Sequence, residues 1–340
     1  MNGSADSSGF LSLCRFASQN VVAVCGVVNN WLQGPLVGNI ILDAETMQDI
    51  DGKVARVLAD LGNLGPPLPL EEVRELLSLD RAFYTANDAA LLKETIHRLK
   101  VAGKQVLLRP SLLIDAVRKL ELKALWVPDR RRILVDKELH PARQRWGEAH
   151  EIGHSLIPWH DQMLHGDPQR TLQQACQIRL EAEANYAAGR LLFLRGEFRE
   201  RLLSSPVTLD LVRGLAKMFG NSVTATLWRA VEVLDRPAFG LISQHPRDPF
   251  PPDGSPVRHF IRSPEFARCF SNVSPEPVFA LLYRFCFRRN GPIGHDEITL
   301  GDAVGVTHVF AVECFHNRYD TLTLGVARQA GHRRTIVLTD

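Results

Sequence analysis

The sequence predicts an α+β protein with more than one domain, and three observations lead to this prediction. The chain has 340 residues, more than one hydrophobic core usually organises, so two or three domains are expected. Helical periodicity dominates residues 47–234, where only two short β-like runs interrupt it. A stretch rich in proline, "RDPFPPDGSP" (247–256), separates this part from strand-like segments near the C-terminus.

Composition limits the classes of partner. Apolar residues make up 45% of the chain and charged residues 23%, as in folded globular proteins. The 40 basic and 38 acidic residues nearly balance, so no global field draws the chain to nucleic acid or anionic lipid. The six cysteines are scattered without a CxxC pair. Neither a zinc knuckle nor a disulfide framework is indicated, and a reduced, cytoplasmic setting is expected.

The N-terminal region contains an apolar run over residues 10–32, which we do not expect to enter a membrane. It lacks a basic leading segment, and Arg15, Gln19 and Asn20 interrupt it, whereas a spanning helix needs about 20 apolar residues. Met47 opens a more regular helical segment, so residues 1–46 are set apart as an N-terminal extension of uncertain status.

Two helices and a pair of strands are expected ahead of the central motif. The first helix runs from Met47 to about Leu61, and the second follows a Pro/Gly break and has acids in its first turn. A further helical pattern, "AALLKETIHRLKV", comes next. The strands "ALWV" (124–127) and "RILVD" (132–136) are separated by Pro128 and charged residues that suit a hairpin turn.

The motif HEIGH lies on a helix expected from Pro141 to about Pro158. His150 and His154 are one turn apart on the same face, so both imidazoles can bind one zinc ion. Glu151 lies about 100° further round the helix, beside the metal, where it can deprotonate a zinc-bound water. This spacing favours a hydrolytic zinc centre with one Zn²⁺ per chain.

The third ligand is expected from the helix "QIRLEAEANYAAGRLLF" (177–193), which carries Glu181 and Glu183. Glu181 shares a face with small and apolar residues that permit a close approach to the first helix. Glu183 lies roughly 200° away, near Arg179 and Arg190, and is expected on a solvated face. The alternative, in which both acids face water, stays open, but periodicity favours Glu181.

These stretches resemble the ImmA/IrrE family of zinc metallopeptidases. The family has an Arg-x-aromatic-x-x-Ala-His-Glu-x-Gly-His helix, which reads "RQRWGEAHEIGH" here, and a Glu-x-x-Ala-Asn-x-x-Ala-Ala helix, which reads "EAEANYAAG". The resemblance is specific from about Leu125 to Phe193. Trp146-Gly147 stand where the family usually has Phe-Thr, and "LLFL" continues where a proline often follows. Both departures leave the metal ligands intact.

The resemblance implies a minimal, helix-rich zincin core with a small sheet and a gluzincin-like third ligand at Glu181. It also implies an endopeptidase of narrow specificity that cleaves a helix-turn-helix repressor and so releases a stress or mobile-element response. Glu151 would act as the general base. Three candidates for steadying the oxyanion, which the sequence does not rank, are His160, His165 and Tyr186.

The expected domains are a peptidase domain at 47–200, a helical module at 201–240, a linker at 241–256 and a mixed α/β domain at 257–340. The module contains two helical patterns around Gly220-Asn221 with a helix-turn-helix-like spacing. Basic residues are sparse on its second helix, so DNA binding is left open. The last domain matches the position of a sensory domain in some family members but shows no ligand motif.

Two other functions remain open from the sequence. The first is a DNA-binding or scaffolding regulator with a vestigial metal site. The second is a zinc hydrolase that acts on a non-protein amide. The complete ligand set and the intact Glu151 argue against the first. Only the family resemblance argues against the second.

Overall fold

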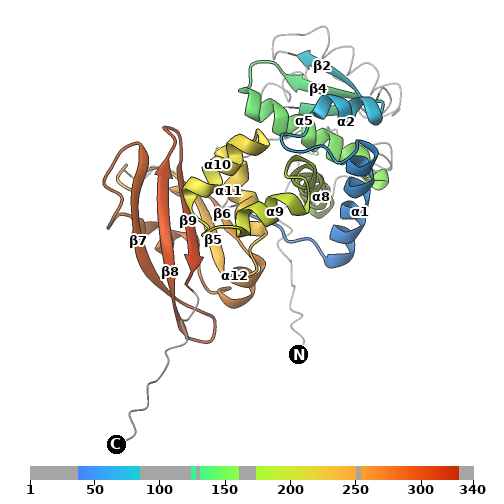
Figure 1. Cartoon of the computed structure of the whole chain (residues 1–340). Coiled ribbons are helices and arrows are strands. Elements are labelled where there is room, and N and C mark those ends of the chain that lie inside the picture. Colours follow the sequence, from blue (N-terminus) through green and yellow to red (C-terminus); the bar gives the residue numbers. More distant parts are fainter. Residues whose placement is uncertain (1–36, 85–123, 128–130, 161–173, 250–253, 329–340) are drawn as a thin grey trace, which may run out of the picture.

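The computed structural model describes residues 37–84, 124–127, 131–160, 174–249 and 254–328. Predictions that fall elsewhere, including the helix around residues 89–101, His165 and the strand at the C-terminal end, lie outside these residues. The described part has the expected α+β composition, with helices packed beside two sheets (Figure 1). None of its helices is long and apolar enough to cross a membrane.

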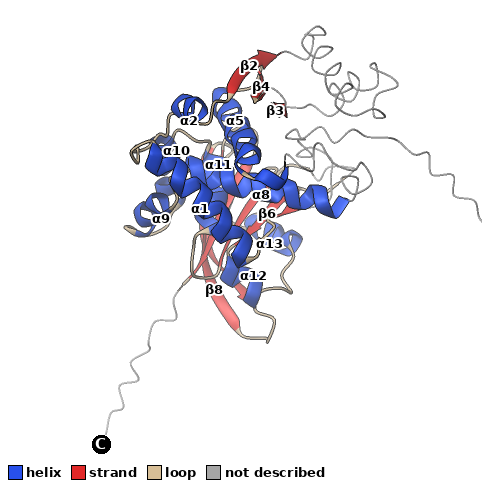
Figure 2. Ribbon diagram, turned by 90° about the vertical axis from the view of Figure 1, so that its right-hand side faces the viewer, coloured by secondary structure: helices blue, strands red, loops and turns tan. Residues whose placement is uncertain are grey.

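The first half of the described chain is a group of helices beside a small sheet. Its elements are α1 (Ala44–Asp60), α2 (Leu70–Leu76), β2 (Asp80–Tyr84), β3 (Ala124–Val127), β4 (Arg132–Asp136), α5 (Pro141–Leu156), α8 (Gln174–Leu192) and α9 (Gly196–Leu203). The sheet order is β2-β4-β3. β3 and β4 pair antiparallel, as a hairpin requires, whereas β2 joins β4 in parallel. Both overall views place this sheet beside α5 (Figures 1 and 2).

The second part of the fold is a larger sheet with helices on both faces. It is built mainly from the C-terminal half of the chain and also includes β1, the first described strand. Its elements are β1 (Val37–Gly38), α10 (Leu209–Phe219), α11 (Val223–Glu232), β5 (Ala238–Ser243), β6 (Val257–Arg262), α12 (Pro264–Cys269), α13 (Pro275–Leu282), β7 (Gly291–Gly301), β8 (Thr307–His316) and β9 (Thr321–Ala327). The strand order is β1-β6-β5-β9-β8-β7. Strand β5 therefore lies inside the sheet, paired with β6 and β9.

Alternation along β5 divides the apolar core into two clusters. Ala238 and Ile242 lie on the face of β5 that packs on α11, and they join one continuous cluster that runs from α1 through α11. Phe239 and Leu241 face the other way, into a second cluster under α12 and α13. Because side chains alternate between the faces of a strand, a single β5 contributes to both clusters.

Three sequence expectations need correction at the level of elements. The expected linker at 241–256 begins with three residues of β5, and the expected helical module at 201–240 ends with the first three. α1 begins at Ala44, where the Asp43 side chain accepts from the Thr46 amide, so this helix starts before Met47. The sequence did not predict six further elements, which are β1, β2, α9, β6, α12 and β7. The division into domains itself stays a prediction.

The second helix of the expected helix-turn-helix is not a free surface. α10 and α11 meet at Gly220, whose left-handed φ of 66° ends α10, and Ser222 caps α11. α11 then packs on α10, β5, β6 and β9. Every residue of α11 is buried or half-buried. A recognition helix needs an exposed face to enter the major groove, and α11 does not offer one.

Candidate metal centre

Helix α5 carries the HEIGH motif into the interior of the protein. Pro141 occupies the first helical turn, where its missing N–H is harmless, and the ring of His140 accepts from the Ala142 amide. From Gly147 to His154 every residue of α5 is buried. A buried helix segment with four ionisable side chains, Glu148, His150, Glu151 and His154, needs partners for them.

Close packing of α5 against α8 brings the histidines of α5 and the glutamate of α8 together. Gly153, between the two histidines of the motif, faces the backbone of α8. A Cβ atom at Gly153 would lie 2.7 Å from the Ala184 carbonyl oxygen and 3.2 Å from the Ala187 Cβ. Glycine at this position and small residues on α8 therefore allow the close approach that places Glu181 beside the histidines.

Three side chains converge at this contact. His150 Nε2 lies 3.1 Å from His154 Nε2 and 3.2 Å from Glu181 Oε2. His154 Nε2 lies 3.9 Å from Glu181 Oε1. Tetrahedral zinc with bonds of 2.0–2.1 Å holds its ligand atoms about 3.3 Å apart. The spacing and the chemistry of the three donors therefore fit one zinc ion, and this group is the one set of possible metal ligands found among the described residues.

Hydrogen bonds hold both imidazoles with Nε2 toward this point. His150 Nδ1 lies 3.0 Å from Asn185 Oδ1, and His154 Nδ1 lies 2.9 Å from His160 Nδ1. The amide oxygen of Asn185 can only accept, so His150 carries its proton on Nδ1 and keeps the Nε2 lone pair for a metal. Asn185 follows Glu181 by one helical turn, which is the signal that could have identified it in the sequence.

The pKa shifts of the two histidines differ in sign. Burial, together with the neighbouring rings of His150 and His160, lowers the pKa of His154 well below its ordinary value, which favours the neutral, metal-binding form. Burial also acts to lower the pKa of His150, but hydrogen bonding to Glu181 and the charges of Glu181 and Glu151 outweigh it and raise that pKa. A cation in this position would replace the proton as the partner of these carboxylates.

Glu181 and Glu183 do not divide between metal and solvent as expected. The side chain of Glu181 is 38% exposed, although it lies beside His150 and His154. Glu183, which was expected in water, is 1% exposed and contacts His160 and Arg179. The reason is tertiary: α8 packs against α1 as well as α5 (Figure 1), so the face that carries Glu183 is covered. Arg190 pairs with Asp51 of α1 instead of Glu183.

The general base and the oxyanion candidates have distinct environments. Glu151 is fully buried on α5, one residue beyond His150, and its charge acts on that ring. His160 is also fully buried, and both of its ring nitrogens are in hydrogen bonds, to His154 and Glu183. The Tyr186 hydroxyl donates to Asp51. Neither described candidate is arranged as a free oxyanion donor, and His165 lies outside the described residues.

A buried HEIGH helix packed against a helix that carries Glu181 is an arrangement that could hold a metal ion. Residues 108–230 match the sequence model of peptidase M78, described as the IrrE N-terminal-like domain. This match supports the assignment of this part of the chain to the ImmA/IrrE family. The match runs through α5, α8 and α10 and ends within α11.

Similarity to solved structures is confined to the fold. A transcriptional regulator from Mycobacterium tuberculosis matches with a TM-score of 0.50 and 15% sequence identity, over 82% of this chain and 76% of that chain. At this identity the match shows a shared arrangement of helices and sheets. No protein with a curated description matches the chain.

Proposed function

We propose that the protein is a zinc-dependent endopeptidase, with His150, His154 and Glu181 holding the metal and Glu151 acting as general base. The observation that carries this proposal is the convergence of three ligand atoms within 4.8 Å of one another, beside a buried glutamate on the same helix. The family of the matched domain supports peptide hydrolysis as the reaction.

The mechanism assigns each side chain a separate task. Held by His150, His154 and Glu181, a zinc ion would supply the Lewis acidity that activates a water molecule and polarises a peptide carbonyl. His150 and Asn185 fix one ligand direction, and His154 and His160 fix another. Glu151 accepts the proton of the attacking water and returns it to the leaving amine. Because Glu151 is shielded from bulk water, its charge is screened less than that of an exposed carboxylate.

The substrate we propose is a helix-turn-helix transcriptional repressor, whose cleavage releases a stress or mobile-element response. The family resemblance supports this proposal. The similar structure from M. tuberculosis is described as a transcriptional regulator. The likeness is one of fold alone, and a role in gene control is consistent with it. Direct reading of DNA by α11 is disfavoured, since none of its residues is exposed.

The test measures metal content and cleavage together. Purified protein is analysed for zinc, and then incubated with helix-turn-helix repressors, with casein and with small amides. We expect about one zinc per chain and a single cut in one repressor, abolished by Glu151→Gln. A metal-free protein that cleaves, or equal digestion of casein, would contradict the proposal. Turnover of small amides alone would favour the non-protein hydrolase.

A further inference from the structure

A chain of hydrogen bonds leads from the candidate metal ligand His154 to the far side of α8. His154 Nδ1 lies 2.9 Å from His160 Nδ1, and His160 Nε2 lies 3.2 Å from Glu183 Oε2. Arg179 Nε donates to the other oxygen of Glu183 at 2.8 Å. The side chains of His154, His160 and Glu183 are at most 1% exposed. No member of this chain beyond His154 belongs to the ligand set proposed above.

One arrangement of protons satisfies all three contacts when His154 Nε2 presents its lone pair to a metal. His154 Nδ1 then carries the proton and donates to His160 Nδ1. His160 must in turn carry its proton on Nε2 and donate to the Glu183 carboxylate. In this arrangement both histidines are neutral and Glu183 is ionised. The lone pair that His154 Nε2 keeps for the metal therefore determines which group donates and which accepts in each hydrogen bond.

We propose that Glu183, acting through His160, is a positioning residue that fixes the tautomer and ring orientation of His154 as a metal ligand. This inference rests on the proposed function. The two ligand histidines then differ in their support, because His150 is held by the neutral amide of Asn185 and His154 by an imidazole backed by a carboxylate. A carboxylate behind a ligand histidine raises its basicity, and loss of such a partner typically weakens metal binding by 10–100-fold.

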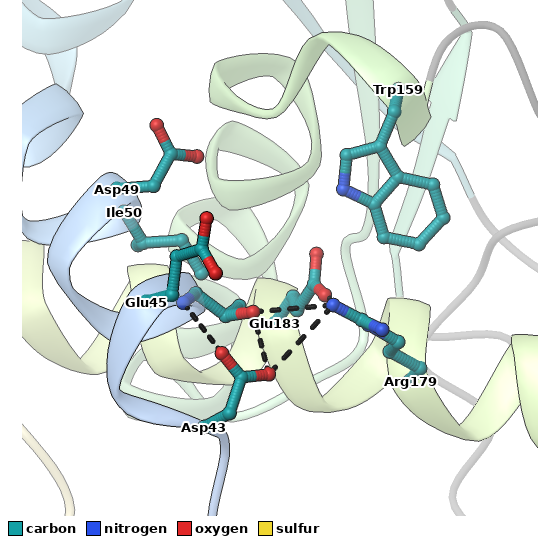
Figure 3. A pocket seen from close by; sticks show the side chains of 8 residues that line it. Asp43, Glu45, Asp49, Ile50, Trp159, Arg179 and Glu183 are labelled. Atoms are coloured by element: carbon teal, nitrogen blue, oxygen red, sulfur yellow. Dashed lines mark hydrogen bonds and ion pairs between the residues drawn. The ribbon is translucent and has the colours of Figure 1, made fainter.

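The outer end of the chain is anchored on α1. Arg179 donates to Thr46 Oγ1 at 3.2 Å and lies 3.9 Å from Asp43 Oδ2. Figure 3 shows Arg179 beside Glu183 and Asp43, at the edge of a hollow that Trp159 also lines. The Arg179 side chain is 58% exposed, so its contribution should be smaller than that of the buried members.

The experiment compares two buried carboxylates on the two helices of the centre. Glu148 of α5 is 5% exposed and contacts Arg74 and Arg81, so Glu148→Gln is the matched control for Glu183→Gln. Zinc affinity is measured by competition with a chromophoric chelator, and unfolding temperature is measured on the metal-free proteins. We expect Glu183→Gln to weaken zinc binding 10–100-fold and Glu148→Gln to leave it within about twofold, although both lower the unfolding temperature.

Two further measurements separate positioning from a general structural role. The absorption spectrum of the Co²⁺-loaded protein should change in Glu183→Gln and remain as in wild type in Glu148→Gln. His160→Ala and the double variant His160→Ala/Glu183→Gln should have equal zinc affinity, since His160 is the connection through which Glu183 acts. Additive losses in the double variant would contradict the relay.

The outcomes distinguish this inference from the proposed function. A wild-type protein without zinc affinity overturns the proposed function. Tight zinc binding that Glu183→Gln leaves unchanged overturns only the positioning role. If Glu183→Gln does not fold, the exposed Arg179→Gln decides: zinc binding weakened by about two- to fivefold supports the relay, and wild-type affinity contradicts it.

Discussion

The helix pairs α5/α8 and α10/α11 are both tightly packed, yet their interiors differ in chemistry. Beside the contact of α5 with α8 lie the buried ionisable groups His150, Glu151 and His154. The contact of α10 with α11 buries mainly apolar groups such as Val212, Leu215 and Leu227. Burying ionisable groups costs free energy unless partners or a metal compensate it. The α5/α8 pair is therefore organised as a site, and α10/α11 as a scaffold that joins it to the larger sheet.

The largest effect should come from the ionisable groups of α5. Glu151→Gln should reduce cleavage by roughly 10²–10⁴-fold while zinc stays bound, because a general base takes no part in holding the metal. His154→Ala should lose both zinc and activity. Elemental analysis and cleavage rates on the two variants check this. Loss of zinc from Glu151→Gln would show that this residue is a ligand. That result would contradict the separate roles of Glu151 as general base and His154 as metal ligand.

A second prediction concerns the core under the larger sheet. Phe310 is fully buried, with its ring 5.3 Å from that of Phe270 and 5.7 Å from those of Phe239 and Phe266. Phe310→Ala should lower the free energy of unfolding by about 3–5 kcal/mol without changing zinc affinity of the folded protein. Denaturant unfolding and a zinc titration measure the two quantities. A parallel loss of zinc affinity would reveal coupling between the two regions.

The third prediction uses a glycine at the α5/α8 contact. Gly153→Ala places a Cβ atom 2.7 Å from the Ala184 carbonyl oxygen, so the helices must separate, at a cost of about 1–3 kcal/mol. Zinc affinity should fall as well, because Glu181 moves away from the histidines. Wild-type stability and affinity in Gly153→Ala would mean that the close helix contact is not required.

The smallest effect is expected at the corresponding glycine of the scaffold pair. A Cβ atom at Gly214 of α10 meets nothing within 4 Å, and Gly214 lies within the helix. Gly214→Ala should therefore raise the free energy of unfolding by about 0.5–1 kcal/mol, since alanine loses less backbone entropy in a helix. Thermal unfolding should show a lowered unfolding temperature for Gly153→Ala and a raised one for Gly214→Ala. A lowered unfolding temperature for Gly214→Ala would contradict the contrast between the two helix pairs.

The sequence by itself determined the local features of this protein. The spacing of His150, Glu151 and His154 predicts one helical face, and the hairpin strands at 124–127 and 132–136 were predicted where they lie. Periodicity also selected Glu181 as the acid nearest the histidines, and the structure brings these three side chains together. These inferences succeed because helix and strand periods depend on local geometry alone.

Tertiary structure decided what surrounds each face. Glu183 lies opposite Glu181, as the period requires, but α1 covers that face, so Glu183 is buried with His160 and Arg179. Likewise, "AFGLIS" has no pattern that separates an inner strand from a segment leading into a linker, and pairing with β6 and β9 makes it β5. α11 has the spacing of a recognition helix, but the sheet covers it. Whether a helix face meets water or protein depends on neighbours distant in the chain, which a local pattern does not encode.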